Sequence, residues 1–157
     1  MDFVITLSKL HVQHGTGGPF AAAIFARKDH TLVAVGLNIV VASACSILHA
    51  EMVAITLAQA TLQTFNLKEQ GDFELLSSCE PCAMCFGALP WSGIQHLACA
   101  ANTADAQAIG FDEGPKHPQW KQTLEQRGIQ VSTGIQQQQA AAVLQQYQAM
   151  QGVIYNA

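Results

Sequence analysis

The chain has 157 residues and a formal net charge of −4; half of its residues are hydrophobic and only 11% are charged. This length and composition predict a single domain over residues 1–157 with a well-buried core, and they exclude a disordered chain. Apolar runs such as residues 20–26 are much shorter than the roughly 20 residues that cross a bilayer, which excludes a membrane-spanning protein.

The basic residues are few and dispersed. The seven Lys and Arg are scattered along the chain, and Arg27-Lys28 is their only adjacent pair. A protein that binds many phosphates gathers its basic residues on one face, so nucleic acid is not an expected partner. The N-terminus, Met1-Asp2-Phe3, lacks the basic start of a signal peptide, and we therefore expect a cytoplasmic protein.

The first part of the chain predicts a helix, a hairpin and a second helix. Apolar residues at helical spacing indicate a helix over residues 2–14. Residues 20–26 and 32–37 have the composition of two strands joined by a short turn. From Ala50 to Ala58, apolar residues recur at i, i+3, i+4, i+7 and i+8, which predicts a helix with one face on a sheet.

Strands and helices continue to alternate along the rest of the chain. The expected elements span residues 73–78 (strand), 82–91 (helix), 97–101 (strand), 120–127 (helix), 129–133 (strand) and 136–150 (helix). This order predicts an α/β fold, a three-layer α/β/α sandwich with a mixed five-stranded sheet and helices on both faces.

Two short segments combine the residue types of a zinc site. Cys82 and Cys85 are three residues apart, so on a helix both sulfurs project from the same side. The N-terminus of a helix lowers the pKa of a thiol, which favours the thiolates that a metal needs. His49 begins the other helix and can supply an imidazole. Three N and S ligands leave the fourth position to water or hydroxide, the arrangement of a catalytic zinc.

Glu51, two residues after the histidine, is the expected proton shuttle, since a carboxylate there can take a proton from the activated water and pass it to a leaving nitrogen. Two alternatives are a thiol redox pair and a non-catalytic zinc module, closed by Cys79 or Cys45 as a fourth ligand. Cys79 is expected at a strand end on the far side of Pro81, which disfavours it as a fourth ligand. The combined His-x-Glu and Pro-Cys-x-x-Cys pattern is typical of zinc deaminases.

The chain resembles the cytidine deaminase-like zinc hydrolase superfamily, and within it the bacterial guanine deaminases. The residues that carry the resemblance are Gly17-Gly18-Pro19-Phe20, Asn38, His49-Ala50-Glu51, Ser78 to Cys85, Gly87-Ala88, Trp91 and Gly110-Phe111-Asp112-Glu113. The zinc motifs point to the superfamily, and the Gly-Phe-Asp-Glu segment points to the guanine branch.

This resemblance implies hydrolysis of guanine to xanthine and ammonia, with one catalytic zinc per subunit whose hydroxide adds to purine C2. Glu51 and Glu113 would be catalytic, and Asn38 would recognise the base. The remaining expected substrate-binding residues are Phe20, Ala50, Glu80 and Trp91. Glu113 has an alternative in a solvated acidic loop. The other histidines, at positions 11, 14, 30, 96 and 117, match no motif and are expected at the surface or in loops.

The resemblance also implies a homodimer, in which the C-terminal segment, residues 152–157, can be exchanged between subunits and help to close the site. Packing of this apolar segment on its own subunit is the alternative. Other substrates remain open: ammeline as a side activity, cytosine or cytidine, and the adenosine of a tRNA, which requires a basic surface.

Overall fold

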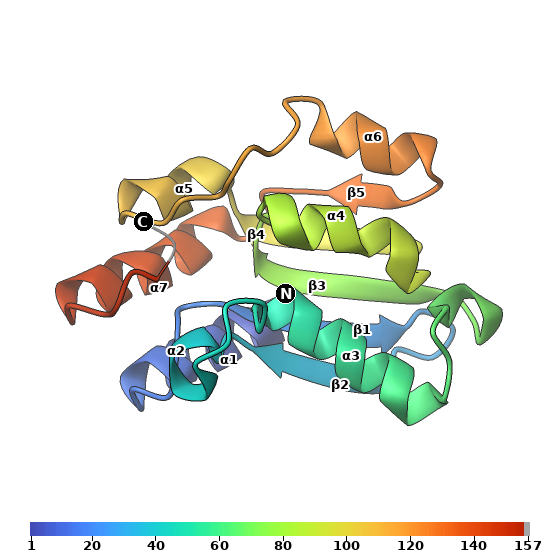
Figure 1. The fold of residues 1–157 in the computed structure, drawn as a ribbon, viewed down its shortest axis with the longest axis horizontal. Helices are drawn as coiled ribbons and strands as arrows, with labels where there is room; N and C mark the ends of the chain where they lie inside the picture. The colour runs from blue at the N-terminus through green and yellow to red at the C-terminus, as the bar shows by residue number, and fades with distance from the viewer. Residues whose placement is uncertain (156–157) are drawn as a thin grey trace.

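A computed structural model describes residues 1–155 and has a five-stranded sheet at its centre, with strand order β2-β1-β3-β4-β5 (Figure 1). The strands are β1 (Ala21–Ala26), β2 (Leu32–Leu37), β3 (Phe73–Cys79), β4 (His96–Ala101) and β5 (Gln130–Ser132). β1 is antiparallel to β2 and β3, whereas β3, β4 and β5 run parallel, so the predicted mixed five-stranded sheet is confirmed.

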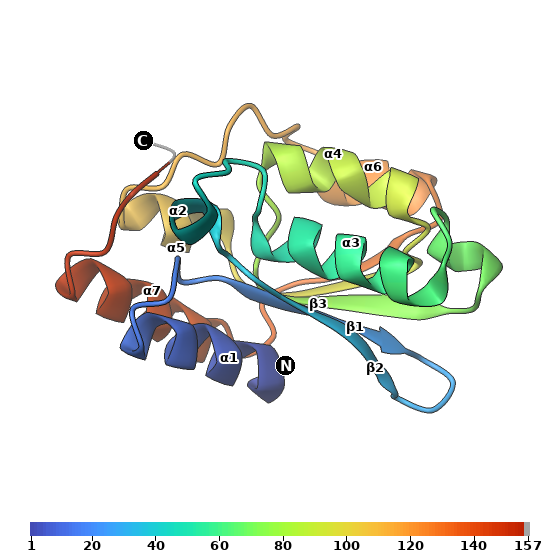
Figure 2. The ribbon, with the colours of Figure 1, turned by 60° about the horizontal axis from the view of Figure 1, so that its bottom comes forward.

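Helices cover both faces of this sheet and make three layers. They are α1 (Asp2–Gln13), α2 (Val40–Ser43), α3 (Ala50–Leu62), α4 (Ala83–Ser92), α5 (Thr103–Ala108), α6 (Trp120–Gln126) and α7 (Gln137–Ala149), with a 3-10 turn at Leu67–Glu69. α3, α4 and α6 lie on one face, and α1 and α7 lie on the other (Figure 2). Between residues 1 and 155, no helix combines the length and apolar character that crossing a membrane requires.

Each face of the sheet has its own hydrophobic core. One cluster includes Ile24, Leu75 and Leu97 from the strands with Leu124 of α6. The other cluster joins the α1 and α7 layer to the opposite side of the sheet and includes Ile5, Ala100, Val143 and Leu144. Because helices cover both faces, the interior strand β1 is apolar at consecutive positions rather than at alternate ones.

Two short helices are absent from the sequence prediction. α2 and α5 have four and six residues, too few for a helical period to show in a hydrophobic pattern. α5 nevertheless carries a start signal, since Asn102 and Asp105 form a capping box in which each side chain accepts the other's backbone N–H. The predicted helix at 82–91 begins one residue later, because Cys82 is the N-cap of α4.

The position of α3 depends on close contact with β2. A Cβ atom at Gly36 would overlap the carbonyl oxygen of Ala50 and lie 2.5 Å from the nitrogen of Ala54. Ala50, Ala54 and Ala58 are fully buried, so the face of α3 toward the sheet consists largely of small side chains. This contact sets how closely the first turn of α3, with His49 and Glu51 around it, approaches the sheet.

We therefore expect Gly36→Ala to lower the free energy of unfolding by about 1–3 kcal/mol, because the added methyl group pushes α3 off the sheet. Urea denaturation measures the change. Gly87→Ala is the matched control, since nothing lies within 4 Å of a Cβ at this position in α4. The control should leave stability unchanged or raise it by up to about 1 kcal/mol. Equal stabilities of the two variants would contradict the close-contact argument.

Candidate active site

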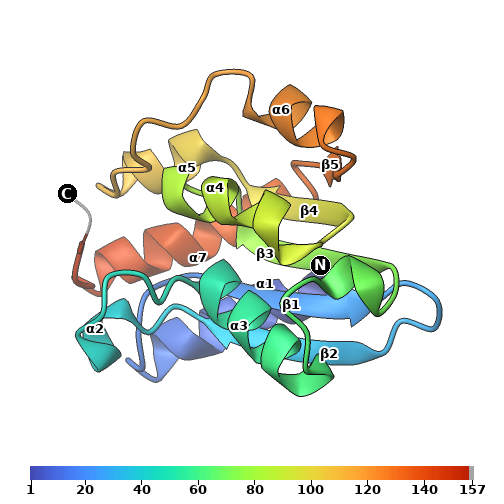
Figure 3. The same cartoon turned by 45° about the vertical axis from the view of Figure 1, so that its right-hand side comes forward.

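Two helix N-termini meet at the end of the sheet where β3 and β4 finish. α3 and α4 begin side by side at that end and run away from it in the same direction (Figures 1 and 3). His49 is the N-cap of α3, and Cys82 is the N-cap of α4. Glu51 and Cys85 follow in the first turns of the two helices. The fold therefore brings the two predicted segments to one place.

The side chains of His49, Cys82 and Cys85 form a potential metal site. Their ligand atoms all lie within 4.8 Å of one another, and Sγ of Cys82 lies 3.5 Å from Nδ1 of His49. Among residues 1–155, this is the only group of three or more His, Cys, Asp or Glu side chains so arranged, and neither Cys79 nor Cys45 belongs to it. Two sulfurs and one imidazole suit zinc, and a three-ligand set is typical of a catalytic site.

The two cysteines differ in acidity. A hydrogen bond from the Cys85 thiol, together with the contact to His49, lowers the pKa of Cys82 to about 4. The pKa of Cys85 is raised by that same bond and by burial. Burial lowers the pKa of His49, but the hydrogen bond and charge of Cys82 raise it by more. The two cysteines thus share one proton, which stays on Cys85 while Cys82 is a thiolate. Metal binding would release this proton.

Glu51 is buried beside the ligands. Its Oε2 accepts a hydrogen bond of 3.5 Å from the Cys85 thiol. Burial and the negative charge of Cys82 raise the pKa of Glu51 to about 7. A carboxyl group with a pKa near neutrality can both take and give a proton, which suits a general acid and base.

A small cavity of ≈ 20 Å³ adjoins the three ligands. It is lined by Phe20, Asn38, His49, Glu51, Cys79, Glu80, Cys82, Phe111, Glu113 and Tyr155. Three buried polar atoms in this lining have no hydrogen-bond partner within the described part of the chain: Nδ2 of Asn38, Oε2 of Glu113 and the hydroxyl of Tyr155. Unpaired buried polar atoms are rare and costly, so their convergence indicates a site for a polar ligand.

The backbone of Asn38 is fixed from several sides. Its N–H donates to the Phe20 carbonyl at 3.1 Å, and its carbonyl accepts from the Gly18 N–H at 3.1 Å. Nε2 of His11 also lies 2.8 Å from that carbonyl. His11 is buried, so the expectation of a surface or loop position is wrong for this residue. The reason is that α1 packs against the sheet and turns its last residues toward Gly17 and Asn38.

Glu113 enters the site from the loop after α5. Only 7% of the residue is exposed, whereas its neighbours Asp112 and Gly114 are on the surface, so the alternative of a solvated position is wrong for Glu113. Its carbonyl accepts a hydrogen bond of 2.8 Å from the Ala83 N–H at the start of α4. Burial and the charges of Cys82 and Glu51 raise the pKa of Glu113 to about 8.

Two aromatic rings of the cavity were assigned no role from the sequence. The ring of Phe111 lies edge to face with Phe20 at 5.1 Å and 4.9 Å from the ring of Tyr155. Tyr155 also lies 6.1 Å from the ring of His49. Nothing in their spacing marks these residues, because Phe111 and Tyr155 meet only through the fold.

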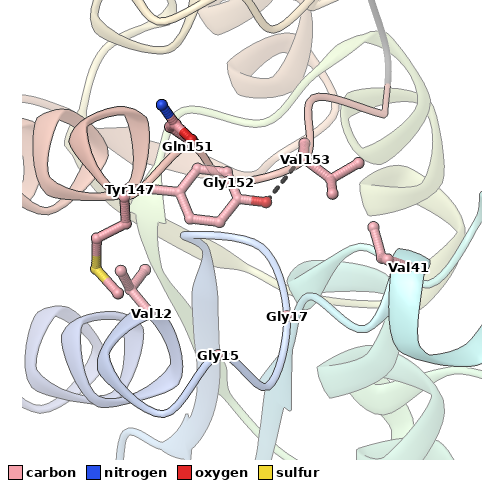
Figure 4. A pocket seen from close by; sticks show the side chains of 9 residues that line it. Val12, Gly15, Gly17, Val41, Tyr147, Gln151, Gly152 and Val153 are labelled. Atoms are coloured by element: carbon pink, nitrogen blue, oxygen red, sulfur yellow. Dashed lines mark hydrogen bonds between the residues drawn. The ribbon is translucent and has the colours of Figure 1, made fainter.

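Tyr155 reaches the cavity because the chain turns back after α7. The Tyr147 hydroxyl donates a hydrogen bond of 2.7 Å to the Val153 carbonyl, which holds the segment against α7 (Figure 4). A separate cavity of ≈ 220 Å³ lies under this segment, between it and Val12, Gly17 and Val41. Asn156 and Ala157, which end the predicted C-terminal segment, lie outside the described residues.

Three predicted substrate-binding residues differ in how they lie relative to the cavity, and only Glu80, for which the resemblance implies a role largely through its backbone, lines it. Trp91 does not line this cavity: it is 79% exposed, and nine residues of helix place it about 13 Å from Cys82. Ala50 is fully buried against Gly36 and does not line the cavity. Glu80 does line it, but its carboxylate accepts hydrogen bonds from Thr103 instead.

Comparison with known proteins places this site in a family. Residues 1–101 match the family described as cytidine and deoxycytidylate deaminase zinc-binding region. The chain belongs to this family, and it is a zinc-dependent deaminase that acts on a small nucleobase.

The relatives of this chain include guanine deaminases. The guanine deaminase of Bacillus subtilis is 38% identical over 125 residues, which cover 80% of this chain and 77% of that protein. A solved structure of the guanine deaminase from Nitrosomonas europaea is 47% identical with a TM-score of 0.91, over 94% of this chain and 82% of that one. The protein NE0047, solved in complex with 2,6-diaminopurine, is 49% identical with a TM-score of 0.93, over 99% and 82%.

Zinc content tests the three-ligand set. We expect Cys82→Ser to weaken zinc binding by more than about 10-fold, since the variant loses the thiolate ligand. Cys79→Ser is the control, because Cys79 is buried beside the site but outside the ligand group. Mass spectrometry of the dialysed proteins measures bound zinc. Loss of zinc from the Cys79 variant as well would indicate a closed, four-ligand site.

Proposed function

We propose that this protein hydrolyses guanine to xanthine and ammonia. The observation that carries the proposal is the set of three unpaired polar atoms, on Asn38, Glu113 and Tyr155, around a cavity that adjoins His49, Cys82 and Cys85. The relatives support it, since two are named guanine deaminases and NE0047 has been solved with 2,6-diaminopurine and 8-azaguanine.

Guanine offers groups that match these side chains. Its amino group and ring N–H are donors for the Glu113 carboxylate, and its ring nitrogens and carbonyl oxygen are acceptors for the Asn38 amide. The rings of Phe20 and Phe111 supply apolar surface for the flat faces of a base. Glu80 and Ala50 would contribute through their backbones only, because the Glu80 carboxylate is engaged elsewhere and Ala50 is buried against Gly36.

His49, Cys82 and Cys85 would hold one zinc ion in each subunit, leaving a position for water. Bound zinc supplies a Lewis acid that makes water nucleophilic near neutral pH. Glu51 takes a proton from the attacking water as its oxygen bonds to purine C2, and it gives this proton to ring nitrogen N3. The second proton of the water then passes through Glu51 to the amino nitrogen on C2. The bond between C2 and that amino nitrogen breaks and C2 keeps the oxygen as a carbonyl, so guanine and water become xanthine and ammonia. Glu113 holds the amino group in place during these transfers.

Other substrates of the same family fit less well. A tRNA requires a basic surface, and the seven basic residues here are dispersed along a chain of net charge −4. Ammeline shares the amino-substituted edge of guanine, so we propose it as a slow side substrate.

Glu51→Gln should lower ammonia release from guanine by at least about 100-fold, because the amide cannot move the proton. The variant should keep its zinc, since Glu51 is not one of the three ligands. The assay compares guanine, ammeline, cytosine, adenine and the corresponding nucleosides, with guanine expected to react fastest. Unchanged activity of the zinc-loaded variant would contradict the mechanism. A faster reaction of the wild-type protein with another base would identify that base, and not guanine, as the preferred substrate.

The C-terminal segment is proposed to close the site within a cytoplasmic homodimer of one-domain subunits. With Tyr155 in place, the cavity of ≈ 20 Å³ has room for about one water molecule and not for a purine. Tyr155 is one of the residues that line this cavity, and we propose that it moves out to admit a base and then returns over the bound base to exclude water. In a homodimer, the segment that returns can belong to the same subunit or to its partner.

Mixing two inactive variants distinguishes these routes. Glu51→Gln keeps Tyr155 but lacks the proton shuttle, and Tyr155→Ala has the reverse defect. If the segment is exchanged, mixed dimers contain one complete site, and activity should recover to about a quarter of the wild-type value after subunit exchange. No recovery, with mixed dimers demonstrated by native mass spectrometry, would mean that each segment covers its own subunit.

A further inference from the structure

A second cluster of charged side chains lies behind the turn that carries the first zinc-binding cysteine. Nζ of Lys116 donates a hydrogen bond of 3.0 Å to the carbonyl of Pro81 and lies 3.7 Å from Oε2 of Glu80. It also donates to the hydroxyl of Thr103. The Lys116 side chain is only 8% exposed, so these contacts replace most of its hydration.

Glu80 is the anchor of this cluster. Its Oε2 accepts hydrogen bonds from the N–H and the hydroxyl of Thr103, at 3.2 and 3.0 Å. Its Oε1 lies 3.5 Å from Nζ of Lys121, which is 44% exposed. The ring of Trp120 lies 4.7 Å from Nζ of Lys116 and supports it through a cation–π contact. The carboxylate of Glu80 is thereby committed to structure.

The contacts of Lys116 join two parts of the active site. Lys116 follows Glu113 by three residues, and Pro81 directly precedes Cys82. One ammonium group therefore ties the loop that carries Glu113 to the turn that carries a zinc ligand. The hydrogen bond from the Ala83 N–H to the Glu113 carbonyl is a second tie between the same two segments. Gly114 and Pro115 between them are exposed, so the loop has little other support there.

We propose that Lys116 is a positioning residue, which holds the Glu113 carboxylate at a fixed place relative to Cys82 and Cys85. The proposal rests on the proposed function, because it assigns Glu113 a task in the reaction. Without the ammonium group, the backbone bond to Ala83 is the remaining one of these two ties between the loop and the turn before Cys82, so Glu113 is held less firmly relative to the substrate. A displacement of about 1 Å near the reacting atoms can cost on the order of 100-fold in rate.

Lys116→Met and Lys121→Met form a matched pair. Each removes one positive charge beside Glu80, but only Lys116 contacts Pro81 and Thr103. We expect Lys116→Met to lower kcat for guanine on the order of 10- to 100-fold while zinc content stays at the wild-type level. Lys121→Met should change kcat by less than about 3-fold, since it loses a half-exposed ion pair. Equal effects of the two variants would overturn the proposal.

A double variant that combines Lys116→Met with Glu113→Gln distinguishes loss of Glu113 positioning from a general disturbance of the active site. If Lys116 acts through Glu113, Lys116→Met should have much less effect on kcat in the Glu113→Gln background than in the wild type. Multiplicative effects in the double variant would overturn the proposal. If Lys116→Met does not fold, Thr103→Val replaces it, because this change removes a partner of Lys116 and keeps all charges; we expect a smaller fall in kcat with the same dependence on Glu113.

Amide hydrogen exchange gives a readout that does not require activity. Residues 111–118 and the Ala83 N–H should exchange faster in Lys116→Met than in Lys121→Met, because a tie between the two segments is lost. Unchanged exchange would overturn the proposal. If the wild-type protein releases no ammonia from guanine, the proposed function fails, and the exchange measurement still decides whether Lys116 fixes the loop.

Discussion

The first turns of α3 and α4 direct their free N–H groups toward one region, and this region is where the protein concentrates negative charge. The positive ends of two helix dipoles favour thiolates and carboxylates there. His49 and Cys82 are the N-caps, and Glu51 and Cys85 are buried in the first turns of the same helices. The site requires both helices to begin at the same edge of the sheet. The close contact of α3 with Gly36 fixes the position of one helix, and the short connection from β3 to α4 fixes the position of the other.

This concentration of buried polar and charged groups lowers the stability of the folded protein. Burial raises the pKa values of Glu51 and Glu113, since neither carboxylate is well solvated or well paired. Asn38, Glu113 and Tyr155 keep polar atoms without partners in the described structure. A fold selected only for stability would place apolar side chains at these positions. The buried charges of the nearby Glu80 cluster are paired instead: each has a partner of opposite sign and accepts or donates hydrogen bonds.

The parts of the site that sequence predicts are those encoded at short range. The spacing of Cys82 and Cys85, and of His49 and Glu51, indicates which side chains share a helix turn, and the structure brings both pairs together. Alternation of strands and helices likewise predicted the mixed sheet. Two contacts near the site have no such local signal: that of His11, a single histidine in an apolar helix, with Asn38, and that of Phe111 with Tyr155, which lie 44 residues apart in the chain. Trp91 shows the reverse case, because the resemblance suggests a pocket position, whereas the length of α4 separates this residue from the cavity beside Cys82.

The buried histidine of α1 gives the layers a connection that the sheet alone does not provide. His11 lies on the opposite side of the sheet from α3 and α4, yet its ring contacts the carbonyl of Asn38, whose side chain faces the cavity. Thr16 contacts the other ring nitrogen at 2.5 Å and so helps to orient the imidazole. Under the proposed role of Asn38 in binding the base, discrimination between bases would be coupled to the packing of the N-terminal helix. Directed evolution toward a new base would then select changes in this helix as well as in the cavity, and a library confined to cavity residues would miss them.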